Sequence, residues 1–244
     1  MAWVIHGLLE QAALGPDELE AVAEQGRTPL EQIAHRRLSA LVSPTDEAEL
    51  LPSRANMLLH TRVLEAAAER ATVVPMRFGV VVPDEDTVVA EYLEVEHDAL
   101  LAKIERLRGH VELRLRGRYD EATVLREVLA SDKRAARLRG REDLDAKMEL
   151  GERIIAGIEA RREVDAERVA AALGDHVAEA APGPVAEQLD AFTWSFLVSR
   201  DGLEAFDRAV DALGEQLAGR IELELVGPVP PFSFADPDTS RMAG

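Results

Sequence analysis

Apolar and polar positions along the first third of the chain follow the pattern of a small α/β domain. Ala2 to Leu8 is almost continuously apolar, which predicts a short buried strand, and Gly15-Pro16 opens a helix. Leu30 to Val42 carries apolar residues between turn signals, which predicts a hairpin of two short strands. Arg54 to Ala71 then has apolar residues at helical spacing, and Thr72 to Phe78 returns to the composition of a strand. The predicted order of elements is therefore β-α-β-β-α-β.

This order is typical of the ferredoxin-like arrangement, in which a sheet carries helices on one face. Pro83 and Asp84 then begin a helix that is predicted to continue to about Leu107, with Val95 on its apolar side. Gly109 follows as a break in the pattern. We therefore predict that the first domain spans residues 1–108.

The pattern from Gly109 onward predicts a second α/β domain in residues 109–244. Val111 to Arg116 alternates apolar and charged residues, which is the period of a half-buried strand. Asp120 to about Ala180 is rich in Ala, Arg, Glu and Leu, and Gly140 divides this block into two arms. The two arms predict a helical hairpin inserted into the domain.

Three further elements follow this hairpin. Phe192 to Ser199 has the composition of a strand, and Asp201 caps a helix with a clear amphipathic stripe. Ile221 to Val226 alternates again and predicts the final strand, before a proline-rich ending. The second domain is thus expected to combine a small sheet with several helices.

We predict that the first and last strands of this domain pair antiparallel, because outward Arg114 and Arg116 would match outward Glu222 and Glu224. The predicted fold class is α+β, with two small α/β domains. The first is ferredoxin-like. The second is a short antiparallel or mixed sheet with a long helical insertion.

Composition favours a folded cytoplasmic protein and argues against nucleic-acid or membrane partners. Hydrophobic residues make up 47% of the chain, which suffices for a core, and the absence of cysteine excludes disulfides and thiolate sites. The net charge of -18 repels nucleic acid and anionic membrane surfaces. A locally basic stretch from Lys103 to Arg141 is interpreted as a solvated face. Neither a secretion signal nor an apolar run of membrane-spanning length is recognised.

The sequence contains no recognisable catalytic, cofactor-binding or metal-binding motif. Its six histidines are scattered without metal-ligand spacing, and motifs for nucleotide cradling or a serine nucleophile are absent. The 46 acidic residues are too numerous for their pairs to mark an acid–base site, since most must face solvent. We therefore predict a protein that is not an enzyme and uses no cofactor.

Two local segments stand out. Val74 to Gly79, VPMRFG, places Arg77 between apolar neighbours where a strand leaves its sheet, and we predict that a carboxylate or backbone carbonyls hold Arg77. Gly227 to Phe234, GPVPPFSF, is rigid and suited to lying over an apolar surface. We predict that this ending packs on the C-terminal domain and buries Phe232 and Phe234. The alternative is an ending that keeps one aromatic exposed for a partner.

Both segments match motifs of a known family, in the same order. GPVPPFSF looks like the family's ending, although Val229 and Phe232 stand where Trp and Tyr are common. VPMRFG is similar to the family's Pro-Leu-Arg-Phe-Gly, with Met76 in place of Leu. His60 and the run Phe196 to Val198 also fit the pattern, whereas the N-terminal strand matches weakly. As a set, these features resemble the gas-vesicle F/L accessory family across essentially the whole chain.

The resemblance implies a non-catalytic role in building gas vesicles, which are hollow protein shells whose main subunit is small and strongly apolar. It further implies a cytoplasmic, gas-vesicle-associated protein whose partners are the main shell protein and other gas vesicle accessory proteins. The alternative is a small-molecule-binding regulatory protein with paired ferredoxin-like domains, which a concave polar pocket would favour. The candidate interaction or structural residues belong to the two motifs: Arg77, Phe78, Gly79, Gly227, Pro228, Pro230, Pro231, Phe232, Ser233 and Phe234.

Overall fold

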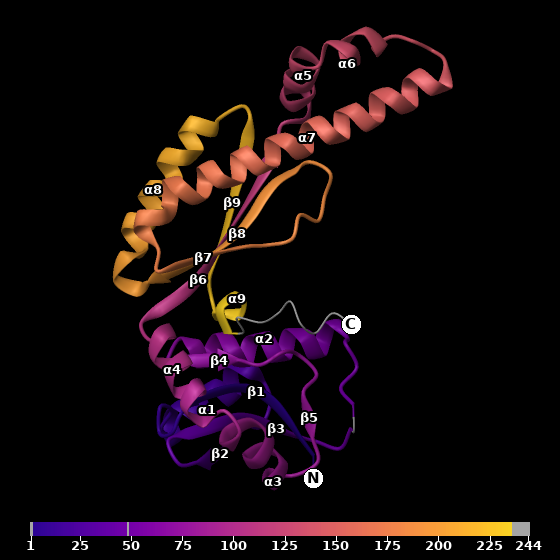
Figure 1. Cartoon of the computed structure of the whole chain (residues 1–244). Helices are drawn as coiled ribbons and strands as arrows, with labels where there is room; N and C mark the ends of the chain where they lie inside the picture. The colour runs from indigo at the N-terminus through magenta and orange to yellow at the C-terminus, as the bar shows by residue number, and fades with distance from the viewer. Residues whose placement is uncertain (1, 48, 236–244) are drawn as a thin grey trace. The chain divides into compact units, whose positions relative to one another are not determined.

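The computed structural model describes residues 2–47 and 49–235, and the chain divides into two compact units. The first unit comprises the chain up to Glu112 together with the segment from Pro228 onward, and the second comprises Leu113–Gly227. Each unit has its own sheet and its own helices (Figure 1). The proline-rich ending, which we expected in the C-terminal domain, therefore belongs to the first unit.

The first unit is built around a sheet with the strand order β2-β3-β1-β4, in which all neighbours run antiparallel and β5 also pairs with β1. Helices α1 and α2 pack against each other, while η1 contacts β2 and β3 (Figure 1). The elements are, in chain order, β1 (Ala2–Glu10), α1 (Pro16–Gly26), β2 (Glu31–His35), β3 (Leu38–Thr45), α2 (Arg54–Ala68), β4 (Val73–Pro75), β5 (Val81–Val82), α3 (Glu85–Thr87), η1 (Val88–Glu94), α4 (His97–Leu107) and α9 (Phe232–Ala235).

Local sequence signals fix the first turns of the two main helices of this unit. Pro16 is the first residue of α1, and the Glu18 carboxylate accepts a hydrogen bond from the Gly15 N–H at 2.7 Å. At α2, the Ser53 hydroxyl oxygen accepts from the Asn56 N–H at 3.1 Å. The apolar faces of both helices close over one core, whose buried members include Leu9, Val22, Leu41, Val63, Leu64 and Val73.

The long helix predicted from Asp84 to Leu107 is wrong as a single element. The chain forms α3, continues as the π-helix η1, and restarts as α4 after a turn that begins at Val95. The wider π turn buries both Val88 and Leu93, which lie five residues apart. Val95, predicted on the apolar side, is instead 73% exposed. Packing of η1 against β2 and β3 determines which of its side chains face the core. The spacing of apolar residues in the sequence does not show this change.

The second unit contains a sheet with the strand order β7-β8-β6-β9. Helices α7 and α8 contact each other and β8, and α5 and α6 pack along α7 (Figure 1). The elements are β6 (His110–Tyr119), α5 (Glu121–Ser131), α6 (Lys133–Leu138), α7 (Leu144–Leu173), η2 (Gly174–His176), β7 (Glu179–Pro182), β8 (Asp190–Ser199), η3 (Arg200–Gly202), α8 (Leu203–Leu217) and β9 (Ile221–Val229).

The predicted helical hairpin is present, and Gly140 with a φ of +87° lies in its turn. The helical block ends earlier than the predicted Ala180, because Glu179–Pro182 forms β7 and pairs antiparallel with β8. The alanines and Pro182 of this segment carry little strand preference, so its partner strand makes it a strand. The core beneath the helices is mainly aliphatic and contains the aromatic side chains of Phe192, Phe196 and Phe206.

The predicted pairing of the first and last strands of this unit is confirmed. β6 and β9 are neighbours, and the Asp120 N–H just after β6 donates to the Arg220 carbonyl just before β9 at 2.9 Å. The end of β6 thus lies beside the start of β9, as antiparallel strands require. The charge matching is only partly as expected, because Arg116 bonds to Asp190 on β8 at 2.6 Å.

None of the helices in the described part of the chain combines the length and the apolar character that a membrane span requires.

Candidate functional site

The first motif lies where the chain leaves β4. The strand ends at Pro75, earlier than the predicted Phe78, and the Met76 N–H donates to the His6 carbonyl at 2.9 Å. Gly79 then adopts a φ of +92°, a conformation that residues with a Cβ rarely adopt. The glycine of the motif is therefore required by the sharp exit from the sheet.

Arg77 is solvent-exposed, and within residues 2–47 and 49–235 no carboxylate or carbonyl holds its guanidinium. The prediction that such a group anchors Arg77 is wrong. Phe78 anchors the exit instead, because its ring packs edge-on against His60 with centroids 5.8 Å apart. The guanidinium of the motif is thus available to a partner.

Behind Phe78 lies a buried chain of hydrogen bonds through two histidines. His60 Nε2 is 3.0 Å from the Met76 carbonyl oxygen, His6 Nδ1 is 3.0 Å from His60 Nδ1, and His6 Nε2 is 2.9 Å from Ser43 Oγ. Since the carbonyl can only accept, His60 Nε2–H donates to it and His60 Nδ1 accepts from His6 Nδ1–H. His6 Nε2 then accepts from the Ser43 hydroxyl. One arrangement of protons satisfies all four ring nitrogens.

The two histidines in this chain of hydrogen bonds, His6 and His60, are neutral because they are buried. The pairing of β1 with β3 shifts register between Ile5 and Gly7, so His6 is an extra residue with no residue of β3 paired opposite it. Such a β-bulge changes the direction of the side chain. His6 is 1% exposed and His60 is 4% exposed. Burial lowers the pKa of His6 to about 3, with a further contribution from His60, and burial also lowers the pKa of His60. The neutral pair can therefore hold its hydrogen bonds at pH 7.

A cavity of about 120 Å³ opens beside the histidines, with Ser43, Thr45 and Asn56 also in its lining. This volume suits a few water molecules of about 30 Å³ each, whereas pockets for small-molecule ligands begin at about 300 Å³. Among the residues that the structure describes, no group of three or more acidic or histidine side chains is arranged to hold a metal ion. The histidine chain is thus best understood as support for the motif loop.

Exposed apolar side chains flank the start of α2, the helix that the motif loop contacts at His60. Leu51 is 65% exposed, Met57 51% and Leu58 43%, and they lie just before α2 or in its first turns. The ring of Phe78 rests on the same helix, at His60. We call the surface formed by five side chains the motif face: Leu51, Met57, Leu58, Arg77 and Phe78.

The second motif packs on the first unit, and the prediction that it covers the C-terminal domain is wrong. Phe234 is 4% exposed, and Phe232 packs against the core beneath α1 and α2. The N–H and the hydroxyl of Ser233 donate to the Glu112 carboxylate at 2.7 and 2.8 Å. Arg106 of α4 donates to the Phe234 carbonyl at 2.6 Å. Both aromatics of the ending are therefore committed to the protein's own first unit.

The prolines and glycine of the ending explain where it goes. Pro228, Pro230 and Pro231 have no N–H to donate to a strand ladder, and β9 accordingly ends at Val229. Gly227 bends it with a φ of +138°. Helix α9 then contacts β4, the strand that leads to Arg77. All of the predicted site residues except Gly227 thus belong to the first unit.

Three residues that complete these sites were not singled out from the sequence: His6, Ser43 and Glu112. A histidine followed by Gly7 inside an apolar strand was the available signal for a bulge. Glu112 was expected on the outward face of its strand, yet it is fully buried because Ser233 lies over it. Sequence spacing carries no signal that links positions so far apart.

The second unit buries a different polar cluster, where the helical arm joins the sheet. Asp165 of α7 accepts from the Tyr119 hydroxyl at 2.7 Å and from both terminal nitrogens of Arg220 at 2.9 and 2.8 Å. Glu127 of α5 accepts from Arg220 Nε at 2.8 Å. The hydrogen bonds that Arg220 donates to Asp165 raise the pKa of Arg220, and burial raises the pKa of Tyr119. Both therefore stay protonated at neutral pH.

Comparison with known proteins covers nearly the whole chain. Residues 3–236 match the family described as gas vesicle synthesis protein GvpL/GvpF. A gas vesicle protein F from Streptomyces sp. is 32% identical over 231 residues, which cover 91% of this chain and 93% of the relative. A gas vesicle protein F from Haloferax mediterranei is 25% identical over 238 residues, which cover 95% of this chain and 92% of the relative.

Two crystal structures share the fold. GvpF from Microcystis aeruginosa aligns with a TM-score of 0.77 and GvpF from Anabaena sp. with 0.76, each at 19% identity. The alignments cover 96% of this chain and 99% and 96% of the two structures, respectively. The extent of the family match and the identity to the Streptomyces relative agree with the motifs at Arg77 and at the ending. This chain belongs to the gas vesicle synthesis protein GvpL/GvpF family.

Proposed function

We propose that this chain is a cytoplasmic assembly component that binds the main, strongly apolar gas vesicle shell protein during vesicle formation, and that the motif face is its contact surface. The proposal is carried by the exposure of Leu51, Met57 and Leu58 around the start of α2, the helix on which Phe78 rests at His60. The neighbouring Arg77 is also exposed, and its guanidinium has no partner in the described chain. Contiguous apolar side chains on a protein surface mark interaction sites more often than chance.

The chemistry of the motif face suits an amphipathic partner. Burying a Leu or Met side chain contributes about 1.5–3 kcal/mol, so three such residues supply a useful contact. Arg77 adds directional hydrogen-bond donors to carbonyl or carboxylate groups of the partner. Because the His6–His60 chain fixes the Met76 carbonyl, the loop loses little conformational freedom on binding.

The fold of the first unit is consistent with this role as a rigid platform. We infer that it is a ferredoxin-like unit, since its β-α-β-β-α-β order and its strand order β2-β3-β1-β4 agree with that arrangement. Strand β5 and the helices from α3 to α4 are additions to it. The docked ending closes the platform next to β4.

The proposal is tested by pull-down from gas-vesicle-producing cells with a tagged chain. A triple variant, Leu51→Ser, Met57→Ser and Leu58→Ser, removes the three exposed aliphatic side chains of the motif face and leaves Phe78 and its buried support intact. We expect recovery of the main shell protein to fall at least about ten-fold, equivalent to about 1.4 kcal/mol of binding free energy.

A matched control removes exposed apolar side chains from the second unit: Leu144→Ser, Met148→Ser and Ile155→Ser, all on α7 and 71%, 58% and 47% exposed. This control should retain capture. Equal recovery with both triple variants, at equal expression and melting temperature, would remove the motif face as the contact surface. Failure of the wild-type chain to recover the shell protein, when other vesicle proteins are recovered, would refute the binding role itself.

A further inference from the structure

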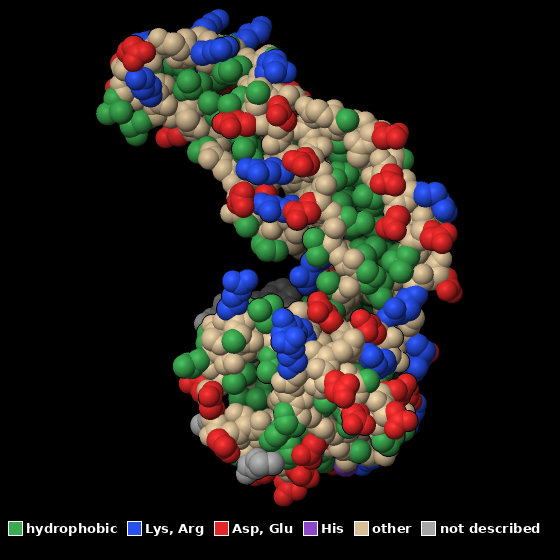
Figure 2. Space-filling view, turned by 180° about the vertical axis from the view of Figure 1, so that it is seen from behind, with side chains coloured by type: hydrophobic (Ala, Val, Ile, Leu, Met, Phe, Trp, Pro, Cys, Tyr) green, Lys and Arg blue, Asp and Glu red, His purple; other side chains and the backbone are tan. Residues whose placement is uncertain are grey.

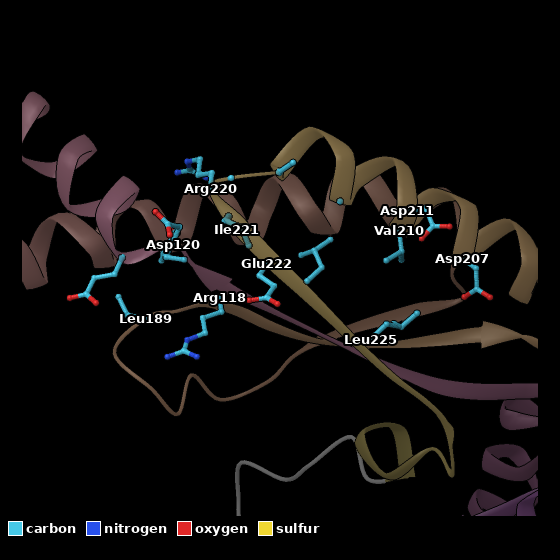
Figure 3. Close-up of a pocket in the computed structure, with 16 residues that line it drawn as sticks. Arg118, Asp120, Leu189, Asp207, Val210, Asp211, Arg220, Ile221, Glu222 and Leu225 are labelled. Carbon is cyan, nitrogen blue, oxygen red and sulfur yellow. The ribbon is translucent and has the colours of Figure 1, made fainter.

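The outer edge of the second sheet forms one wall of a groove. β9 stands at the end of the strand order β7-β8-β6-β9, so one of its edges has no strand of the described chain beside it. A groove of about 1030 Å³ lies along β9 and α8. Figure 3 shows Leu225 of β9 and Val210 of α8 in its lining, with Ile221 and Arg220 at the start of the strand. An unpaired strand edge thus runs beside a helix.

The groove is acidic on both sides. Asp207 and Asp211 line it from α8 and Glu222 from β9, and Glu224 lies in the adjoining hollow with Glu222. All four side chains are exposed, and within the described residues none has a hydrogen bond or an ion pair. Figure 2 shows acidic side chains flanking apolar ones over the α8 side of the second unit.

The cations of the groove do not neutralise these carboxylates. Arg220 is occupied by Asp165 and Glu127, outside the groove. Arg118 of β6 is exposed and makes no ion pair within the described part of the chain. Four unpaired carboxylates in the main groove, those of Glu121, Asp207, Asp211 and Glu222, therefore face one unpaired cation within the described residues, and Glu224 lies next to them.

We propose that this groove binds an extended, basic segment of a partner protein, which adds to β9 as a further strand. An edge strand beside a helix offers main-chain hydrogen bonds on one side and side-chain pockets on the other, which is the geometry of strand addition. Because side chains alternate along a strand, Lys or Arg residues would meet the carboxylates while every second, apolar residue meets Val210 and Leu225. Pro228 limits the pairing to the strand before it. This site is independent of the motif face.

The charge of the groove favours a basic segment over a second copy of the chain, nucleic acid or an acidic peptide. A second copy of the chain pairing edge to edge would place Glu222 and Glu224 against their own counterparts, on two molecules that each carry a net charge of -18. Charged residues on an edge strand exclude like-charged strands, and here they select a cationic one. Nucleic acid and acidic peptides are disfavoured for the same reason.

The test uses fluorescence anisotropy with the full-length protein and three labelled ten-residue peptides. One alternates Lys and Val, one alternates Glu and Val, and one has the Lys–Val composition with two central Val replaced by Pro, which blocks strand pairing. We expect the Lys–Val peptide to bind at least about ten-fold more tightly than either of the others. The amides of Leu223 to Val226 should exchange hydrogen more slowly in its presence.

Matched charge reversals separate the groove from general attraction to an acidic protein. Glu222→Lys with Glu224→Lys should weaken the Lys–Val peptide at least about ten-fold. Glu163→Lys with Glu167→Lys, on an exposed part of α7, changes the net charge equally and should leave binding within about two-fold. Equal weakening by both pairs, equal binding of the proline peptide, or unchanged exchange in β9 of the wild-type protein would each overturn the proposal.

Discussion

The first unit buries two neutral histidines beneath its motif loop, whereas the second unit buries a carboxylate, Asp165, beneath its helical arm. His6 and His60 satisfy each other and two neutral oxygens, so their network holds no net charge. Asp165 is 3% exposed and is held by Tyr119 and by the Arg220 guanidinium. The neutral network can be disrupted by one proton, while the ionic one is vulnerable to the loss of a partner.

This difference matches what each network supports. The histidine chain holds a loop whose Arg77 faces solvent, and it does so with neutral hydrogen bonds alone. The ionic cluster joins α5, α7, β6 and β9 at the base of the helical hairpin, and charge-assisted bonds hold those elements together. Each unit also contains one tryptophan, Trp3 in the first and Trp194 in the second, so Trp3→Phe and Trp194→Phe proteins report on one unit each.

The largest expected effect is loss of the ionic cluster. Asp165→Ala should destabilise the second unit by about 3–5 kcal/mol, because it leaves Arg220 partly buried and without its main partner. Urea unfolding followed through Trp194 in the Trp3→Phe background measures this. Glu167→Ala, an exposed position on the same helix, is the control and should change the unfolding free energy by less than about 0.5 kcal/mol. A shift of similar size in the Trp3 transition, when Asp165→Ala is placed in the Trp194→Phe background, would mean that the units do not unfold separately.

The second expected effect concerns the ending. Phe234→Ala should destabilise the first unit by about 3 kcal/mol, since the ring is 4% exposed and its loss leaves a cavity. Trp3 should report this loss in the Trp194→Phe background. Val226→Ala, at an exposed position of β9 just before the ending, serves as the control. If Phe234→Ala left the Trp3 transition unchanged, the ending would not stabilise the first unit.

The third prediction is that stability between pH 7.5 and 5 depends on pH more steeply in the first unit than in the second. The pKa of His6 and that of His60 are lowered on folding, so the unfolded chain binds more protons. Stability is therefore complete above pH 6.5 and falls as the pH drops toward 3, by up to about 1.4 kcal/mol per pH unit for each histidine. Urea unfolding between pH 7.5 and 5, followed through Trp3, measures the slope.

His6→Asn should reduce this slope, although it lowers the stability at pH 7.5. His176→Asn, at an exposed histidine of the second unit, should leave the Trp3 slope unchanged. Tyr119 and Arg220 keep their protons throughout this range, because both pKa values are raised. A slope in the His6→Asn protein equal to that of the wild type would contradict a role for the buried pair in the pH dependence.

The smallest expected effect separates two arginines. Arg77→Ala should change the stability of the first unit by less than about 0.5 kcal/mol, because the side chain is exposed and unpaired in the described chain. Arg116→Ala should cost more, because it removes the ion pair with Asp190, which is 1% exposed. Thermal unfolding of both variants gives the comparison. A clear decrease in the melting temperature of the Arg77→Ala protein would mean that Arg77 stabilises the fold.

The sequence by itself determined most of the elements and their order, but not the break between η1 and α4 or the strand β7. Helix starts at Pro16 and Ser53 follow local signals, and the apolar periods of the strands and of α8 are visible in short windows, because period and capping depend on neighbours in the chain. The two motifs were recognisable for the same reason. Their glycines, Gly79 and Gly227, occupy positive-φ positions that a local bend requires.

Only the tertiary structure decided which surfaces these segments meet. Phe232 and Phe234 were expected to be buried, but which core they cover depends on where β9 ends and on the free surface beside β4. Arg77 was expected to have a partner, yet the turn at Gly79 directs it to solvent. The pairing of Glu112 with Ser233 joins positions 121 residues apart. Contacts at such separation are set by the geometry of packed elements, and a single sequence contains no local pattern that reports them.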